Sequence, residues 1–191
     1  MKKKFKIINK KILHSGFFKS YKYTIKHIKH DGSWSNPMIR EVFGGSHVSA
    51  VLPYDPINKK IVLIKQFRTG LLKYNFNPII TEIVAGIIDP GETPKQAAKR
   101  ECEEEIGCKV TNLKKIHSFL PAPASSESYY HIFVGKIKSF EGKRIMGQMN
   151  ENEDIMSKCY SYDDVQSMLS NNKIINGLTI IALQWFFLNI K

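Results

Sequence analysis

A helix with complete start and stop signals lies in the middle of this chain, at residues 94–106. Thr93 is a natural N-cap, Pro94 suits the first helical position, and Gln96 completes a capping box. Gly107 supplies the stop at the other end. Apolar, β-branched runs come before and after this segment, so the sequence predicts a helix packed on a sheet and an α/β order of elements.

Extended segments account for much of the remaining chain. Apolar and polar side chains alternate at residues 20–26, Asp31-Gly32 then predicts a hairpin turn, and residues 38–43 resume the pattern. We therefore expect residues 1–46 to form a small antiparallel β-sheet ahead of a domain at residues 47–191. In that domain the expected strands are 48–54, 60–67, 79–86, 110–120, 129–139 and 153–162, and the closing helices are about 163–171 and 177–190.

No targeting or membrane segment is evident in the sequence. Residues 1–11 are basic but lack the roughly 7–15-residue apolar core of a secretory signal. The most apolar stretch, residues 177–190, contains a Gln and is shorter than the about 20 residues that a membrane span needs. The three cysteines, Cys102, Cys108 and Cys159, include no C-x-x-C pair. We expect a cytoplasmic protein with reduced thiols and no membrane partner.

The formal net charge of +12 raises the question of nucleic-acid binding. The lysines, however, are spread through strands and loops and do not form one dense block. A lysine-rich background is the simpler interpretation, so no nucleic-acid partner is expected. A positive field would still attract a small anionic substrate.

Acidic residues concentrate in the predicted central helix, against the basic balance of the chain. Glu101, Glu104 and Glu105 stand at i, i+3 and i+4, so they share one helix face. Exposed like-charge pairs at these spacings destabilise a helix by about 0.2–0.5 kcal/mol each, so a compensating cation or a functional reason is expected. Oxygen ligands favour hard cations such as Mg²⁺ or Mn²⁺. The alternative is a solvated acidic face.

The residues around this acidic face follow a fixed spacing, G-x5-E-x7-R-E-U-x-E-E-x-G-U, where U is apolar. The matching residues are Gly86, Glu92, Arg100, Glu101, Glu104, Glu105 and Gly107. The pattern resembles the signature of the Nudix hydrolases, although Cys102 and Cys108 stand where that family usually has aliphatic residues. Cysteine behaves as a small hydrophobe, so the departure is minor. The resemblance implies an α/β/α sandwich of mixed sheets after the N-terminal sheet, and hydrolase activity.

Several residues of the pattern have structural tasks that follow from their chemistry. Gly86 lets the chain turn tightly before the helix, and Gly107 stops the helix. Glu92 and Arg100 carry opposite charges, so an ion pair between them would tie the loop to the helix.

The resemblance also implies a metal site with more than one ion. Such ions would neutralise a pyrophosphate and activate a water. Glu101 and Glu105 would be the main Mg²⁺ ligands, Glu104 a further ligand or orienting residue, and the carbonyl of Ala85 a backbone ligand.

Stretches outside this pattern look like the ADP-ribose pyrophosphatase branch of the family. They are QFR at residues 66–68, TEIVAG at 81–86, SFLPAPASSES at 118–128 and ENEDI at 151–155. That branch has a mobile acidic loop whose glutamate positions or deprotonates the attacking water. By position Glu151 matches best, and Glu153 is the neighbouring candidate for catalysis, metal binding or orientation. A solvated turn without a catalytic part is the alternative.

The same resemblance suggests residues that recognise the substrate. A guanidinium suits phosphate oxygens and an aromatic face suits adenine, which makes Arg68, Arg40 and Phe17 candidates. In the resembling enzymes the N-terminal strands are exchanged in a homodimer, so Phe17 and Arg40 would serve the partner's site. The alternatives are sheet packing for Phe17 and a surface charge for Arg40. Glu82 is expected near the terminal ribose or an ion, and Glu127 is a further candidate on the ribose side.

Together these observations predict metal-dependent hydrolysis of ADP-ribose to AMP and ribose 5-phosphate, an activity of nucleotide-sugar metabolism. Another nucleoside diphosphate sugar, such as GDP-mannose, would use the same chemistry. A sensor that binds ADP-ribose without cleaving it is a different class, against which the intact acidic set argues. RNA binding or decapping rests on the positive charge alone and predicts steeply salt-dependent binding.

Overall fold

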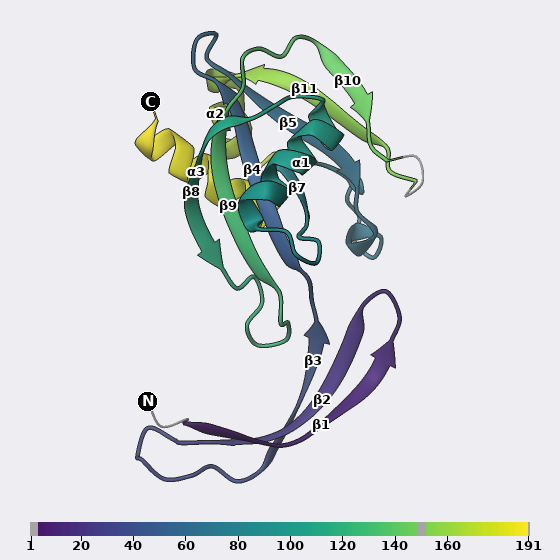
Figure 1. The fold of residues 1–191 in the computed structure, drawn as a ribbon, viewed down its shortest axis with the longest axis vertical. Helices are drawn as coiled ribbons and strands as arrows, with labels where there is room; N and C mark the ends of the chain where they lie inside the picture. Colours follow the sequence, from purple (N-terminus) through teal and green to yellow (C-terminus); the bar gives the residue numbers. More distant parts are fainter. Residues whose placement is uncertain (1–3, 149–151, 191) are drawn as a thin grey trace. The chain divides into compact units, whose positions relative to one another are not determined.

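The computed structural model of this chain describes residues 4–148 and 152–190, and Figure 1 shows the fold. The chain divides into two compact units. One unit contains Met1–His47 and Phe119–Tyr130, and the other contains Val48–Ser118 and His131–Lys191. The assignment of a dimer-forming part to residues 1–46 and of a catalytic domain to residues 47–191 stays a prediction.

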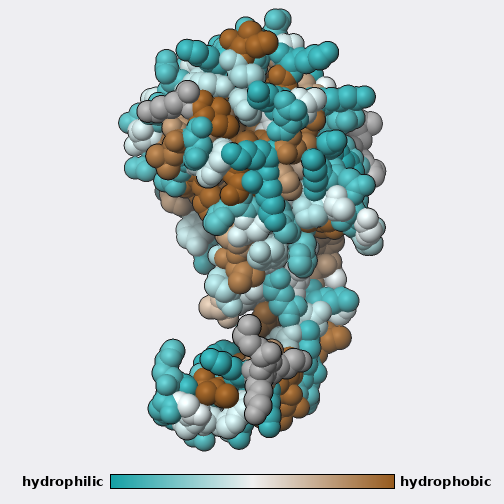
Figure 2. All heavy atoms as spheres, turned by 60° about the vertical axis from the view of Figure 1, so that its left-hand side comes forward, coloured by the Kyte–Doolittle hydropathy of each residue, from teal (hydrophilic) through white to brown (hydrophobic). Residues whose placement is uncertain are grey.

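The first unit is built on a three-stranded antiparallel sheet. Its strands are β1 (Phe5–Ser15), β2 (Lys19–His27) and β3 (Met38–Gly44), paired in the order β1-β2-β3. The extended pattern predicted at residues 20–26 is therefore confirmed. Phe5, Ile12 and Phe17 are each at least half exposed, and Figure 2 shows apolar side chains among the hydrophilic ones on the visible surface.

Among the described residues, the second, larger sheet contains eight strands and is accompanied by three helices. The strands are β4 (His47–Asp55), β5 (Lys60–Phe67), β6 (Ile79–Glu82), β7 (Val84–Ile87), β8 (Thr111–Phe119), β9 (Tyr129–Lys136), β10 (Lys143–Met146) and β11 (Ile155–Ser161). Their order is β10-β11-β5-β4-β9-β8, with β6 beside β5 and β7 beside β4. The helices are α1 (Pro94–Ile106), α2 (Tyr162–Ser170) and α3 (Gly177–Asn189), and a short 3-10 turn, η1 (Thr69–Leu71), follows β5.

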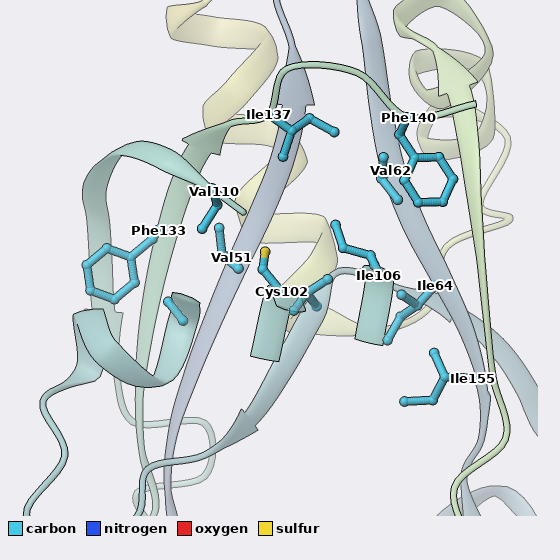
Figure 3. Close-up of a cluster of buried hydrophobic side chains, with 12 residues drawn as sticks. Val51, Val62, Ile64, Cys102, Ile106, Val110, Phe133, Ile137, Phe140 and Ile155 are labelled. Atoms are coloured by element: carbon cyan, nitrogen blue, oxygen red, sulfur yellow. The ribbon is translucent and has the colours of Figure 1, made fainter. Parts of the chain in front are cut away.

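Alternation along the strands of this sheet sends side chains to two different layers. Val62 and Ile64 of β5 belong to the apolar cluster that packs against α1, which Figure 3 shows in close-up. Tyr54 of β4 pairs across the sheet with Ile61, which lies on the opposite face from Val62. The Tyr54 ring meets Phe186 of α3, with centroids 5.1 Å apart. The sheet therefore lies between α1 and α3, which confirms the predicted α/β/α arrangement.

The segment at residues 79–86, predicted as one strand, forms two. β6 pairs with β5 and β7 pairs with β4, so the chain changes neighbour at Ile83. The amide of Ile83 donates to the hydroxyl of Thr179 at 3.0 Å instead of to a strand. The single-strand prediction was wrong because an apolar β-branched run does not reveal where a strand changes partner.

The three predicted helices are confirmed at, or within one residue of, their expected bounds. Strand β10, with four residues, and turn η1, with three, were not predicted, because segments this short do not establish a period. Along the described residues, no helix combines the length and apolar character that crossing a bilayer requires.

Candidate active site

Local signals set both ends of helix α1. The Thr93 hydroxyl accepts from the Gln96 amide at 3.3 Å, and the Gln96 side chain accepts from the Thr93 amide at 2.9 Å. Gly107 ends the helix in the left-handed region at φ 65°. The predicted capping box and stop are therefore both present, and they set where the helix begins and ends.

Two carboxylates lie on the buried side of α1. Ala98, Cys102 and Ile106 form its apolar stripe at i, i+4 spacing and are fully buried. Glu101 and Glu105 each precede a residue of that stripe, so they are carried into the same interface. Only 8% of Glu101 and 3% of Glu105 is exposed. Helix geometry thus places two acids where a soluble helix would normally place apolar side chains.

Burial raises the pKa of both carboxyls. The pKa of Glu101 rises to about 7, because burial outweighs the ion pair with Arg100, and the charges of Glu104 and Glu153 raise it further. The pKa of Glu105 lies well above its ordinary value, first because of burial and then because of the Glu101 charge. The positive charge near Glu101 and Glu105 therefore does not compensate for their burial and mutual repulsion when both are ionised.

The backbone of β7 runs directly beside these carboxylates. Ala85 donates its N–H to Glu105 Oε2 at 3.2 Å. A Cβ at Gly86 would overlap the carboxylate oxygens of Glu101. Glycine is thus required at position 86 by this close approach. The carbonyl of Ala85, predicted as a backbone ligand, belongs to the same stretch.

Arg100 joins the loop before α1 to the glutamates of the helix. It forms the predicted ion pair with Glu92, whose two oxygens lie 3.1 Å from Nε and from Nη2. Nη2 also donates to the carbonyl of Ile87 at 2.9 Å. Nη1 donates to Glu101 at 2.6 Å and to Glu104 at 2.9 Å. The guanidinium therefore relieves part of the repulsion that the glutamate spacing predicts.

The candidate ligands suit a hard divalent cation in chemistry, but they do not surround a preformed ion position. All are oxygens, and the Glu101 carboxylate lies directly against Gly86, where a side chain would overlap it. Within residues 4–148 and 152–190, no three His, Cys, Asp or Glu side chains converge as a cation site. Arg100 instead holds one oxygen each of Glu101 and Glu104.

A second polar network surrounds Glu82, which is 3% exposed. Its Oε2 accepts from Arg68 Nε at 2.8 Å, and its Oε1 accepts from Asn176 Nδ2 at 2.5 Å. Asn176 also caps α3 by accepting from the Thr179 amide at 2.9 Å. Burial raises the pKa of Glu82, and the ion pair with Arg68 opposes that shift. Asn176 was not singled out from the sequence, although an Asn before an apolar run is an N-cap signal.

Of the two acids predicted in the loop before β11, the structure describes Glu153 and not Glu151. Glu151 lies outside the described residues. Glu153 lies near enough to Glu101 and Glu105 for its charge to raise their pKa values. Its Oε1 accepts from Gln66 Nε2 at 3.3 Å. Gln66 was not assigned a role from the sequence, although a polar residue that continues the buried series 62, 64, 66 of a strand is a detectable signal.

The remaining predicted substrate residues, Phe17, Arg40 and Glu127, belong to the first unit. Phe17 is 86% exposed between β1 and β2. Arg40 lies on β3, and its Nη1 donates to the carbonyl of the preceding residue at 2.7 Å. Glu127 accepts from the Tyr23 hydroxyl and lies 3.7 Å from Lys10 Nζ. Their roles in substrate binding stay predictions.

Arg144 of β10 supports the end of α1 and was missed in the sequence. Its Nη1 donates to the carbonyls of Ile106 at 3.1 Å and Gly107 at 3.4 Å. A cation at a helix C-terminus satisfies free carbonyls and interacts favourably with the helix dipole. Glu153 lies between β10 and its partner strand β11 in the sequence. Arg144 therefore links this strand pair to α1, which carries the buried carboxylates. No local pattern marks such a long-range contact.

The sequence is similar to named proteins over nearly its whole length. A family model described as NUDIX domain matches residues 45–178. The ADP-ribose pyrophosphatase of Escherichia coli strain K12 is 34% identical over 183 residues, which cover 96% of this chain and 88% of that protein. The ADP-ribose pyrophosphatase of Haemophilus influenzae is 33% identical over 186 residues, with 96% and 86% covered.

Other similarities are more distant. The GDP-mannose pyrophosphatase of Yersinia enterocolitica is 26% identical over 188 residues, which cover 97% of this chain and 96% of that protein. A crystal structure described as an ADP compounds hydrolase superposes with a TM-score of 0.73 at 20% identity, and covers 97% of this chain and 93% of its own. At that identity the likeness concerns the fold alone.

Proposed function

Because this chain belongs to the NUDIX family of hydrolases, we propose that it cleaves the pyrophosphate bond of ADP-ribose to give AMP and ribose 5-phosphate. The observation that carries the proposal is the pair of buried carboxylates, Glu101 and Glu105, packed directly against the β7 backbone at Ala85 and Gly86. The names of the relatives in Escherichia coli and Haemophilus influenzae support ADP-ribose as the substrate.

We propose Mg²⁺, or Mn²⁺ in its place, as the cofactor, with more than one ion in the site. Glu101 and Glu105 would hold it, and Glu104 and the carbonyl of Ala85 would contribute further oxygens. When bound, a divalent ion neutralises pyrophosphate oxygens and lowers the pKa of a water. The chain itself contributes rigidity, because Arg100 keeps the loop against the helix and so limits how far the carboxylates can move.

Hydrolysis adds one water across the P–O–P linkage. The oxygen of the water bonds to one phosphorus, the bond from that phosphorus to the bridging oxygen breaks, and the water proton needs an acceptor. Glu151 and Glu153 are the proposed groups, and the electrostatic effect of Glu153 on Glu101 and Glu105 supports its place in the site. A carboxylate within hydrogen-bond reach of the water can take its proton or orient it.

Arg68 is the proposed phosphate ligand on the larger sheet. Glu82 holds its Nε at 2.8 Å, and Asn176 holds Glu82 in turn, so the plane of the guanidinium is oriented before substrate arrives. A planar guanidinium can then donate in parallel to two phosphate oxygens. Glu82 itself remains the candidate for the terminal ribose or an ion.

A homodimer that exchanges the N-terminal strands completes the proposal. In it, Phe17 would stack on adenine, Arg40 would contact phosphate, and Glu127 would contact the ribose side of the partner's site. The 86% exposure of Phe17 supports an uncovered stacking surface. A cytoplasmic location is also part of the proposal, and the three free cysteines, Cys102, Cys108 and Cys159, are consistent with it.

The experiment that tests this function compares kcat/KM for ADP-ribose, GDP-mannose, NADH and diadenosine polyphosphates, with Mg²⁺ and after chelation. ADP-ribose is expected to be the best substrate by at least about tenfold, a transition-state preference of about 1.4 kcal/mol. Chelation is expected to abolish turnover, and added Mg²⁺ to restore it. Unchanged turnover in the chelator would contradict the metal assignment.

GDP-mannose is the second candidate, because the Yersinia enterocolitica relative carries that name at 26% identity. A higher kcat/KM for GDP-mannose would replace ADP-ribose as the substrate while leaving the chemistry unchanged. Tight binding of ADP-ribose without any turnover would instead indicate a sensor. RNA binding that weakens steeply with salt would support the nucleic-acid alternative.

A further inference from the structure

The amide of Gln66 contains a buried hydrogen-bond acceptor without a protein partner. Among the described residues, Gln66 Oε1 is the one buried side-chain nitrogen or oxygen that has no hydrogen bond. A buried carbonyl oxygen without a donor is costly, so native proteins rarely retain one without a reason. An orphaned acceptor in a candidate active site therefore points to a donor that arrives with the reactants.

The orientation of this amide is determined by its other end. Gln66 Nε2 donates to Glu153 Oε1 at 3.3 Å. Rotating the amide by half a turn would satisfy neither group, because it would place the amide oxygen against the carboxylate. Oε1 is therefore held in its position by the same contact that positions Glu153.

Gln66 also lies on the face of the sheet that carries the catalytic candidates. Along β5, residues 62, 64 and 66 point to one side, and Val62 and Ile64 pack under α1. Arg68 follows in the same alternation, and its charge reaches Glu105. Along this face of β5, Gln66 therefore lies between Ile64, which packs under α1, and Arg68, the proposed phosphate ligand.

The carboxylate of Glu153 is held from a second direction by its own loop. Its Oε2 accepts from the Gln148 amide at 3.4 Å, and the backbone amide of Glu153 donates to the Gln148 carbonyl at 3.2 Å. Gly147, at φ 115°, has no room for a Cβ, which would lie 2.7 Å from the Glu153 carbonyl oxygen. The turn and Gln66 together leave the carboxylate little freedom.

We propose that Gln66 is a positioning residue that holds Glu153 and accepts, through its buried carbonyl oxygen, a hydrogen bond from an O–H donor of the reaction. That donor is the attacking water or a hydroxyl of the terminal ribose. The proposal rests on the proposed hydrolysis of ADP-ribose, and it assigns Gln66 a task that packing alone would not require.

Two variants distinguish the two proposed contacts of Gln66, the one it donates to Glu153 and the one it accepts from the O–H donor. Gln66→Met is similar in size but lacks both the donor and the acceptor, whereas Gln66→Glu retains an acceptor and places a like charge against Glu153. Gln166→Met, the same change on an exposed part of α2, is the matched control and is expected to leave kcat and KM unchanged. Each Gln66 variant is expected to lower kcat/KM by at least about tenfold, the effect of losing one charge-assisted hydrogen bond.

The split between kcat and KM identifies the donor. Each variant is assayed with ADP-ribose and with an analogue whose terminal sugar lacks a hydroxyl. If water is the donor, Gln66→Met lowers kcat by the same factor on both compounds. If the ribose is the donor, the variant raises KM for ADP-ribose and has no effect on the analogue that lacks the bonded hydroxyl. Unchanged kcat and KM in both variants would overturn the proposal.

A measurement that needs no turnover keeps this result separate from the fate of the proposed function. The side-chain NH₂ signals of Gln66 are identified in an NMR spectrum by their loss in Gln66→Met, and are then followed in Glu153→Gln. A shift of these signals is expected, because their acceptor loses its charge, whereas unmoved signals would refute the contact. If the unaltered protein fails to cleave ADP-ribose, the proposed function falls, and this spectrum still decides whether Gln66 positions Glu153.

Discussion

Glu105 illustrates how burial and chemistry oppose each other at a single residue. Its carboxyl is 3% exposed, and its pKa is raised well above the ordinary value, first by burial. In the proposed reaction it must be ionised to hold a cation. The favourable interaction with the cation therefore has to exceed the desolvation cost, and without metal the charge destabilises the fold.

Replacing Glu105 by Gln separates these two effects. The amide keeps an acceptor for the Ala85 N–H and removes the buried charge, so the melting temperature in a chelator should not fall. The kcat for ADP-ribose should fall by about 10²–10³, the usual effect of losing one electrostatic contact to the transition state. Thermal unfolding and steady-state assays measure both. Glu103→Gln, an exposed neighbour, is the control, and near-normal turnover of Glu105→Gln would sink the metal assignment.

Gly86 offers a second test at the scale of one residue. Gly86→Ala puts a Cβ into the carboxylate of Glu101, so that side chain or the β7 backbone must move. We expect a loss of about 1–3 kcal/mol in the free energy of unfolding, as for other overpacked sites. Activity should fall with it, because Glu101 is displaced. The comparison is Gly70→Ala, where a Cβ meets nothing within 4 Å, and equal urea midpoints for both variants would contradict the close approach.

Among the elements, the turn between β4 and β5 shows how one acid can organise a hairpin. Asp55 is 2% exposed, and its Oδ1 accepts from the amides of Ile57 at 2.9 Å and Asn58 at 3.1 Å. Its Oδ2 accepts from Asn58 Nδ2 at 2.7 Å. Burial alone would raise the pKa of Asp55, but these hydrogen bonds lower it below the ordinary value of 3.8.

The lowered pKa gives Asp55 a pH-dependent contribution whose sign is determined. The folded protein holds this proton less tightly than the unfolded chain, so stability is gained above about pH 3.8 and lost as the pH falls further. Asp55→Asn removes that contribution while keeping one acceptor. Urea unfolding should show the variant less stable near pH 6, with the difference shrinking near pH 3. A difference that stays constant with pH would rule out the ionised Asp55 as its source.

Elements with local signals were predictable from the sequence, and elements that depend on distant partners were not. Thr93 and Gly107 mark α1 through contacts within a few residues, and the prediction of that helix was correct at both ends. The break between β6 and β7 depends on the Thr179 hydroxyl, 96 residues beyond Ile83, and no local pattern encodes it. Strand β10 likewise depends on distant partners, because it pairs with β11 and its Arg144 bonds to the end of α1.

The candidate site divides in the same way. The spacing of Glu101, Glu104 and Glu105 and the Glu92–Arg100 ion pair follow from helix periodicity and charge, so the sequence was sufficient to identify them. Arg100 donates to both Glu101 and Glu104. These contacts depend on side-chain rotamers, which the spacing of residues in the sequence does not determine. Gln66 could not be assigned to the site from the sequence, because its contact is with Glu153, 87 residues later.

For the whole molecule, the proposed homodimer with exchanged N-terminal strands predicts that each active site needs residues from two chains. Phe17→Ala and Glu105→Gln should each be poorly active alone. Mixed after dissociation and reassociation, half of the dimers combine both chains, and each of these contains one site with both native residues. About one quarter of the full activity should therefore return. Sedimentation checks the dimer, and a mixture no more active than its parts would exclude a shared site.

The contacts of α3 with the middle of the chain also affect the time at which the protein becomes functional during synthesis. Glu82 and Ile83 find Asn176 and Thr179 at separations of 94 and 96 residues. At about 5–20 residues per second, a ribosome needs about 5–20 s to extend the chain between these partners. During that interval Oε1 of Glu82 and the amide of Ile83 lack the groups that satisfy them in the finished fold. The nascent chain therefore emerges with the whole sequence of α1 already made, and the groups of α3 that support the break between β6 and β7 arrive last.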